Sequence, residues 1–391
     1  MRIAHVITRM IVGGAQENTL FNCLDLMRDY GDDVLLITGP ALGPEGDLLS
    51  QGRGGDLAVR YIDSLRRNIH PWRDLKSYRE LKRVLREFRP DVVHTHSAKG
   101  GLLGRIAAKR LNVPAVLHTI HGAPFHPYQG ILARNIFRWC EWYAARQCHT
   151  LVSVADAMTE LMVQARVADR SHFQTVYSGM DVEPFLDADR HRDEFRARLG
   201  VEKETVVIGK IARLFHLKGH EFLIEAAREV VPKAPHVKFL LVGDGILREQ
   251  WQRRIAEHGL SDHFLFVGLV PPEEIPKWIG AMDVLVHTSL REGLARALPQ
   301  ALISGKPAIS FDVDGAREVV ISNETGILVP PQDVKNLAAA LLKLAHDPES
   351  RARMGQEGRR RFSDVFRHQT MTRVLRKLYE QLLETSQSRE D

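Results

Sequence analysis

The sequence predicts an α/β protein in which two doubly wound parallel sheets are covered by helices. Apolar runs of strand length alternate with amphipathic helical segments through almost the whole chain. This alternation is interrupted in the polar stretch 178–204 and then starts again. The length of 391 residues also exceeds what one ordinary core covers, which favours two domains.

Each half of the chain has its own series of expected strands. In the first half they lie at 2–8, 33–38, 58–62, 91–95, 114–119, 150–154 and 174–177. In the second half the strand-like runs are TVVIGKIARL, KFLLVGDG, FLFVG, DVLVHTS, PAISFDV and GILVP, and helices are expected at 219–231, 246–258 and 333–346. We therefore place the domains at 1–182 and 183–365, followed by a basic amphipathic helix in 366–391.

The composition restricts the classes of function. It is 44% hydrophobic and 26% charged, as in soluble globular proteins, and no apolar run is long enough for a transmembrane helix. The start, MRIAHVIT, is typical of a first strand and too short for a secretory signal. Cys23, Cys140 and Cys148 show no metal spacing and no paired framework, which favours a reducing cytoplasm. A net charge of +5 permits an anionic partner, but no motif indicates nucleic acid.

Two loops have the composition of anion-binding sites. Ligands of open parallel sheets bind at the carboxyl ends of strands, so we expect the site in these loops and between the domains. Gly13 and Gly14 follow the first strand and open a helix, where bare N–H groups can approach an anion, although a plain tight turn explains them equally well. Arg213 and Lys218 follow a later strand and can hold a diphosphate, the alternative being a solvated loop.

A third loop, in REGLARALPQALISGKP, combines an acid with a helix start. Pro299 is tolerated only in the first turn of a helix, so we expect the helix to begin near Ala297. The 293–296 backbone then lies at the helix mouth, with Gln300 in the first turn. A carboxylate at Glu292 suits a partner with hydroxyls, such as a sugar or ribose, or else is a loop acid favoured by the helix dipole.

These motifs together resemble the family 4 glycosyltransferases, also called group 1 glycosyltransferases, of the GT-B fold. The resemblance covers nearly the whole chain through Gly13-Gly14, TIHG (119–122), VYSGMD (176–181), RLFHLKG (213–219), LVGDG (241–245) and REGLARALPQALISGKP. It implies two Rossmann-like domains facing across a cleft. The N-terminal domain would bind the acceptor and the C-terminal domain a nucleotide sugar, and we expect the final helix to cross back to the N-terminal domain.

The resemblance also implies roles for individual residues. His121 would lie against the donor sugar or its leaving oxygen, and Glu292 would contact the donor sugar. Arg213 and Lys218 would hold the diphosphate. Further donor contacts are expected from Gly13, Gly14, Gly245, Leu269, Gly293, Leu294, Ala295 and Gln300. Gln300 stands where the family has a second acid, so it would meet the ribose through amide hydrogen bonds without a charge.

Histidines and paired acids raise the question of a metal. His118, His121 and His126 lie on and just after one strand, without an acidic ligand at matching spacing. Asp312 and Asp314 have the spacing of a metal-binding pair, but the family is metal-independent. We therefore expect no metal and no cofactor besides the donor substrate, a UDP- or GDP-sugar.

The loop HTHSAKGG follows another strand of the first domain. His96, Ser97 and Lys99 in this loop are candidates for the acceptor side. Ordinary loop polarity explains the same residues equally well.

The function implied by the resemblance is retaining transfer of a hexose from a nucleotide diphosphate sugar to a glycan or lipid-linked acceptor, in cell-surface polysaccharide or glycoconjugate synthesis. An epimerase on the same fold and a non-catalytic nucleotide-sugar-binding subunit are the alternatives. Segment 72–89 predicts a basic amphipathic helix whose apolar stripe packs on the sheet, leaving its basic face for an anionic membrane surface. We therefore expect a cytoplasmic protein, peripheral at the inner face of the membrane.

Overall fold

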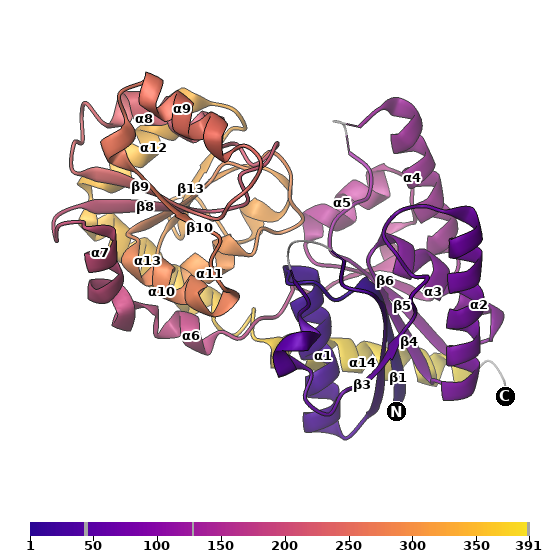
Figure 1. The fold of residues 1–391 in the computed structure, drawn as a ribbon. Coiled ribbons are helices and arrows are strands. Elements are labelled where there is room, and N and C mark those ends of the chain that lie inside the picture. The colour runs from indigo at the N-terminus through magenta and orange to yellow at the C-terminus, as the bar shows by residue number, and fades with distance from the viewer. Residues whose placement is uncertain (43–45, 127–128, 389–391) are drawn as a thin grey trace. The chain divides into compact units, whose positions relative to one another are not determined.

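The computed structural model describes residues 1–42, 46–126 and 129–388. The chain forms two compact units, Met1–Met180 with Phe366–Asp391, and Asp181–Val365 (Figure 1). Each unit has one sheet flanked by helices, so the predicted α/β class is confirmed. All strand pairings in both sheets are parallel among the described residues.

The first unit has a seven-stranded sheet in the order β3-β2-β1-β4-β5-β6-β7. Its strands are β1 (Arg2–Arg9), β2 (Asp33–Gly39), β3 (Ala58–Tyr61), β4 (Val92–His96), β5 (Ala115–Ile120), β6 (Thr150–Ser153) and β7 (Phe173–Thr175). Its helices are α1 (Gly14–Tyr30), α2 (Pro71–Phe88), α3 (Ala98–Arg110), α4 (Ile131–Ala145), α5 (Asp156–Gln164) and α14 (His368–Gln387). The central strands are apolar on both faces because helices cover both.

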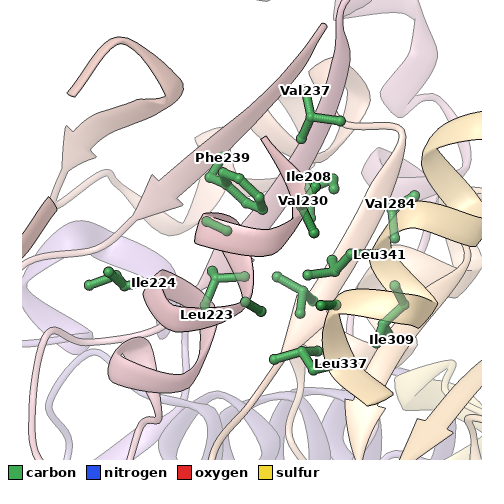
Figure 2. Close-up of a cluster of buried hydrophobic side chains, with 14 of the residues drawn as sticks. Ile208, Leu223, Ile224, Val230, Val237, Phe239, Val284, Ile309, Leu337 and Leu341 are labelled. Atoms are coloured by element: carbon green, nitrogen blue, oxygen red, sulfur yellow. The ribbon is translucent and has the colours of Figure 1, made fainter. Parts of the chain in front are cut away.

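The second unit has a six-stranded sheet in the order β10-β9-β8-β11-β12-β13. Its strands are β8 (Val206–Ile211), β9 (Val237–Val242), β10 (Phe264–Gly268), β11 (Val284–His287), β12 (Ala308–Phe311) and β13 (Gly326–Val329). Its helices are α6 (Glu183–Leu186), α7 (Arg192–Leu199), α8 (His220–Val230), α9 (Arg248–Glu257), α10 (Ile275–Ala281), α11 (Ala297–Ile303), α12 (Val334–His346) and α13 (Pro348–Phe362). Figure 2 shows how helical leucines pack against strand side chains to form its core.

The polar stretch 178–204, where we expected the junction between the domains, has regular secondary structure. It contains α6 and α7, and Arg192 Nη2 on α7 lies 2.6 Å from Asp283 Oδ1, just before β11. The stretch therefore belongs mostly to the second unit, because its arginines pair with an acid of that unit.

The C-terminal helix α14 packs on α1 in the first unit (Figure 1). The buried Asp25 carboxylate accepts hydrogen bonds from His368 Nδ1 at 2.7 Å and Thr372 Oγ1 at 2.9 Å. Tyr379 is fully buried; its hydroxyl donates to Asn22 Oδ1 at 3.2 Å and lies 2.6 Å from His94 Nδ1. The end of the chain is thus part of the first core.

Helix α2 buries the middle of the apolar stripe expected in 72–89 and leaves its start exposed. Leu81, Val84 and Leu85 are buried, whereas Trp72 at its start is 79% exposed. The prediction that this apolar stripe packs inward is therefore confirmed for the middle of the helix. Within 1–42, 46–126 and 129–388, no helix is long and apolar enough to cross a membrane.

We expect Tyr379→Phe to lower the free energy of unfolding by about 1–3 kcal/mol, because the buried polar atoms of Asn22 and His94 then lose a hydrogen-bond partner. Urea denaturation measures this. Tyr61→Phe is the control, since Tyr61 is 51% exposed. An equal effect of both substitutions would contradict a role for the buried hydroxyl.

Candidate active site

Two loops of the second unit meet at the carboxyl edge of its sheet. Strands β8 and β11 are neighbours, so the loops that follow them converge although Lys218 and Glu292 are 74 residues apart in the sequence. Lys218 Nζ donates a hydrogen bond to Glu292 Oε1. Gly219 fixes the approach: its φ is +69°, and a Cβ there would lie 1.8 Å from the Thr288 carbonyl oxygen. A larger residue at position 219 would push the loops apart.

Glu292 is held in place as an anion. Burial would raise its pKa, but Lys218 and His287 outweigh burial and lower the pKa below its ordinary value. Its backbone N–H donates to Asp314 Oδ2 at 2.6 Å. Asp314 has a left-handed φ of +46°, and burial raises its pKa. Asp314, which has the spacing of a metal ligand, thus instead positions the loop that carries Glu292.

A buried lysine lies beneath the same loops. Lys210 on β8 is 1% exposed, and its Nζ donates to Thr288 Oγ1 at 2.8 Å. Thr288 Oγ1 donates in turn to the Gly219 carbonyl oxygen at 2.6 Å. Burial, and then the charge of Lys218, lower the pKa of Lys210 to about 7. The cation at position 210 therefore costs free energy while no anion is bound above it.

The remaining expected donor residues of the second unit lie in the loops that follow β8, β9, β10 and β11 or in the helix α11 after them. The Arg213 guanidinium lies 5.0 Å from the centre of the Phe215 ring. A Cβ at Gly245 would lie 2.5 Å from the Leu214 carbonyl oxygen, so glycine is required there. The Gly293 carbonyl accepts from Gly315 N–H at 3.0 Å. Leu269 is 76% exposed, in the loop after β10.

Helix α11 begins at Ala297, as Pro299 predicts. Gln300 lies in its first turns and is half-buried, and Ala295 is 8% exposed just before the helix. Leu294 lies between Gly293 and Ala295 in the same loop. In the other unit, Gly13 and Gly14 form the start of α1, with Gly14 as its first residue.

The first unit contains a chain of hydrogen-bonded histidines. His5 Nδ1 lies 3.1 Å from His96 Nε2, and His96 Nδ1 lies 3.3 Å from His121 Nε2. Burial lowers the pKa of His96 well below its ordinary value and that of His5 to about 3, so both rings are neutral. A neutral imidazole donates at one nitrogen and accepts at the other. The tautomer of His121 is therefore coupled to that of His5 through His96.

A second set of bonds orients the neighbouring histidines. Because the Tyr379 hydroxyl donates to Asn22, His94 Nδ1–H donates to Tyr379, and His94 Nε2 accepts from Thr119 Oγ1 at 2.7 Å. His118 Nδ1 lies 2.9 Å from Thr95 Oγ1.

Within the described residues, His5, His94 and His96 form a group with ring nitrogens within 4.8 Å of one another, which a metal could join. Both nitrogens of His94 already bond to hydroxyls. A metal there would have to displace one of these short bonds, so the arrangement fits neutral hydrogen-bonded rings better.

The expected acceptor-side residues are all engaged within the first unit. His96 is 1% exposed and contacts His121. Ser97 Oγ lies 2.6 Å from Thr8 Oγ1, and Lys99 Nζ lies 2.6 Å from Asp74 Oδ1. Their contacts order the carboxyl edge of β4 and β1. His5 and Lys210 had no individual functional assignment from the sequence, because only pairing of distant strands brings them to these sites.

We expect Lys210→Met to change how stability depends on pH. The folded-state pKa of about 7 lies below the ordinary 10.5, so the unfolded state binds more protons between these values and stability rises with pH there. This contribution has a slope of at most about 1.4 kcal/mol per pH unit.

Urea denaturation of both proteins between pH 6 and pH 10, taken as about the range of this titration, isolates the effect. The free energy of unfolding of Lys210→Met should lack this rise with pH. The variant should therefore exceed the wild type in stability most at neutral pH, and the difference should shrink as pH increases. A difference between the two proteins that is constant with pH would contradict the assignment.

Comparison with known proteins agrees with this geometry. The model of the family "Glycosyl transferases group 1" matches residues 191–361, and that of "Glycosyl transferase 4-like domain" matches residues 14–179. The chain is 30% identical over 352 residues to the Escherichia coli UDP-Gal:alpha-D-GlcNAc-diphosphoundecaprenol alpha-1,3-galactosyltransferase, covering 89% of this chain and 88% of that protein. It is 25% identical to the Staphylococcus aureus capsular polysaccharide biosynthesis glycosyltransferase CapM, over 85% of this chain and 88% of the relative.

Solved structures of glycosyltransferases share the fold. HepE from Anabaena in complex with UDP superimposes with a TM-score of 0.81 at 22% identity, over 97% of this chain and 100% of that one. Sucrose-phosphate synthase from Thermosynechococcus elongatus gives a TM-score of 0.80 at 21% identity, over 98% and 100%. The two parallel-sheet units, the two family matches and the long alignment to the galactosyltransferase lead to one conclusion: the chain belongs to the group 1 (family 4) glycosyltransferases and has their GT-B fold.

Proposed function

We propose that this glycosyltransferase is a retaining enzyme that moves a sugar from a UDP-sugar to a glycan or lipid-linked acceptor. The observation that carries the proposal is the Lys218–Glu292 ion pair at the carboxyl edge of the second sheet. In this pair a cation suited to a diphosphate and an anion suited to sugar hydroxyls lie side by side, and Arg213 lies near the start of the loop that carries Lys218.

Charge at this edge suits the breaking of a sugar–phosphate bond. As the anomeric C–O bond breaks, positive charge develops on the sugar and negative charge on the departing diphosphate. Lys218 and Arg213 would stabilise the diphosphate, and the Glu292 carboxylate would lie against the sugar. Lys210 would add positive potential from below, because a bound anion favours its protonated form.

Retention is proposed to follow from attack on the face that the diphosphate leaves. The departing phosphate oxygen takes the proton of the acceptor hydroxyl while the new C–O bond forms, so no separate base is assigned. His121, with its tautomer set through His96, would donate to or accept from the sugar without becoming charged.

The choice of donor and acceptor rests on relatives. HepE is bound to UDP in one structure and to UDP-glucose in another. The Escherichia coli relative is named for UDP-Gal and for a diphosphoundecaprenol-linked acceptor. A UDP-sugar and a lipid-linked acceptor are therefore the first pair to test, at a membrane surface in cell-surface polysaccharide synthesis.

We expect Lys218→Met to weaken UDP binding about 10-fold to 100-fold, the loss for one charged hydrogen bond. Glu292→Gln should bind UDP at least as tightly as the wild type, since it frees Lys218, yet should transfer sugar about 100-fold more slowly. UDP titration by thermal shift, with GDP and ADP beside it, and UDP release with acceptor measure the two effects. Glu229→Gln, an exposed acid on α8, is the matched control.

The products separate the alternatives. Release of UDP only when acceptor is present supports transfer. An isomerised sugar without net release of UDP would instead show an epimerase, and tight binding without turnover would show a non-catalytic subunit. Weaker UDP binding by Glu292→Gln would contradict the proposal that Lys218 binds the diphosphate and Glu292 the sugar.

A further inference from the structure

A basic cavity lies at the carboxyl edge of the first sheet. It has a volume of about 300 Å³ and is lined by Pro40, Leu42, Asn68 and the arginines Arg9, Arg66, Arg67 and Arg73. Arg9 ends β1, Leu42 follows β2, Arg66 and Arg67 follow β3, and Arg73 lies in the first turn of α2. The end of one strand, one loop and one helix therefore bring guanidinium groups to one position.

These arginines lack charged partners in the part of the chain that the structure describes. Their hydrogen bonds go to backbone carbonyls: Arg9 Nη1 donates to Leu42 O at 2.7 Å, Arg66 Nε to Asp63 O at 3.0 Å and Arg73 Nη2 to Asn68 O at 3.2 Å. Arg73 Nε is buried and has no hydrogen-bond partner among the described residues. Converging guanidinium groups repel one another unless an anion lies between them.

The nearby carboxylate is already neutralised. Asp74 pairs with Lys99, and one of its oxygens also accepts from the backbone N–H of His70. The cavity therefore keeps its positive charge. Guanidinium groups in this arrangement match the oxygens of a phosphate or diphosphate, which accept paired hydrogen bonds.

The cavity also lies near His121, the residue of the first unit that we propose contacts the sugar. In the sheet order, β1 and β5 flank β4, so Arg9 at the end of β1 and His121 after β5 are about two strand spacings apart, or about 10 Å. A ligand that spans this edge could place a sugar at His121 and a charged group among the arginines.

We propose that this arginine cavity binds the diphosphate of a lipid-diphosphate-linked acceptor sugar. The inference deepens the proposed function and rests on it for the identity of the acceptor. The cavity would hold the acceptor by its anionic link, and thereby distinguish it from a neutral glycan with the same terminal sugar.

The test uses the full chain and two acceptors with the same sugar: N-acetylglucosaminyl diphosphate on a short prenyl chain, and the octyl glycoside of N-acetylglucosamine. Binding of each is measured by calorimetry, and transfer from UDP-galactose by product formation. The variant is Arg66→Ala with Arg67→Ala, both exposed. The control is Arg79→Ala with Arg86→Ala, which removes the same charge from exposed positions on α2.

We expect the cavity variant to weaken binding of the diphosphate acceptor, and raise its KM, about 10-fold to 100-fold. Its kcat, its UDP binding and its use of the octyl glycoside should be unchanged, and the control should match the wild type. Equal losses in both variants would overturn the proposal, since general charge would then explain them. So would binding of inorganic diphosphate as tight as that of the acceptor, with the same dependence on Arg66 and Arg67, which would show a free-anion site.

The binding measurement separates this inference from the proposed function. Absence of transfer by the wild type with either acceptor would contradict the proposed transfer, whereas arginine-dependent binding of the diphosphate acceptor would still support the cavity. Undiminished binding by Arg66→Ala with Arg67→Ala and by Arg73→Gln would overturn the cavity even if transfer occurs.

A second surface is independent of the cavity. Helix α4 exposes a row of large apolar side chains, with Leu132 76% exposed, Trp139 61% and Ile136 50%. Together with Tyr143 they occur at i, i+4, i+7 and i+11 and so share one helix face. The opposite face carries the buried residues Glu141, Ala144 and Ala145.

The exposed charges of α4 are all positive. Arg134, Arg138 and the adjoining Arg146 are exposed, whereas the acid Glu141 is buried and pairs with Arg105 at 3.1 Å. Trp139 stacks on Tyr143 with ring centres 5.9 Å apart. Aromatic rings among apolar and basic side chains are typical of helices that lie in the interface of an anionic bilayer. We infer that α4 docks the first unit on such a bilayer, a role expected from the sequence for 72–89.

Co-sedimentation with phosphatidylglycerol vesicles tests this surface. Ile136→Ser with Trp139→Ser should lower the partition coefficient of the protein between water and these vesicles at least about tenfold. The wild type should bind less to pure phosphatidylcholine vesicles, because these carry no net negative charge. Ile246→Ser with Val374→Ser, both exposed elsewhere, is the control. Equal binding by the two variants would overturn the inference. So would a wild-type dimer in light scattering that Ile136→Ser with Trp139→Ser converts to a monomer.

Discussion

Parallel strand pairing is the constraint on which the candidate functional residues of each unit depend. In the second unit it places β8 beside β11, so Lys218 and Glu292 meet although three helices, two further strands and their connections separate them in the chain. In the first unit it places β1, β4 and β5 side by side, which aligns His5, His96 and His121. Antiparallel pairing would send these loops to opposite edges of the sheets.

The two units use opposite electrostatic solutions. The second concentrates charge: Lys218, Lys210 and Glu292 compensate one another across a few contacts, and a bound diphosphate would complete the balance. The first keeps its central histidines uncharged, because burial lowers the pKa of His5, His94 and His96 and leaves neutral rings joined by hydrogen bonds. Neutral rings can hydrogen-bond to hydroxyl groups and orient them without placing further positive charge beside one another.

Local sequence patterns were enough to predict the strands, and they singled out Lys218 and Glu292, which the structure brings together. Aliphatic runs gave the sheet elements, and Pro299 fixed the start of α11 because proline is tolerated only at a helix start. The histidine chain was beyond such reasoning, since His5 and Tyr379 join it only through packing of the two ends of the chain. The arginine cavity needs a strand end, a loop and a helix at once. The pattern of 72–89 predicted a stripe that packs on the sheet, which the structure confirms for Leu81 and Leu85, whereas membrane contact by its basic face stays a prediction.

A crystal structure of the UDP complex tests the donor site most directly. We expect the diphosphate to lie within hydrogen-bond distance of Arg213 and Lys218, and we expect Lys218 Nζ to have moved from Glu292 towards the phosphate. UDP bound with the Lys218–Glu292 pair intact and no contact between diphosphate and either cation would contradict the proposed site.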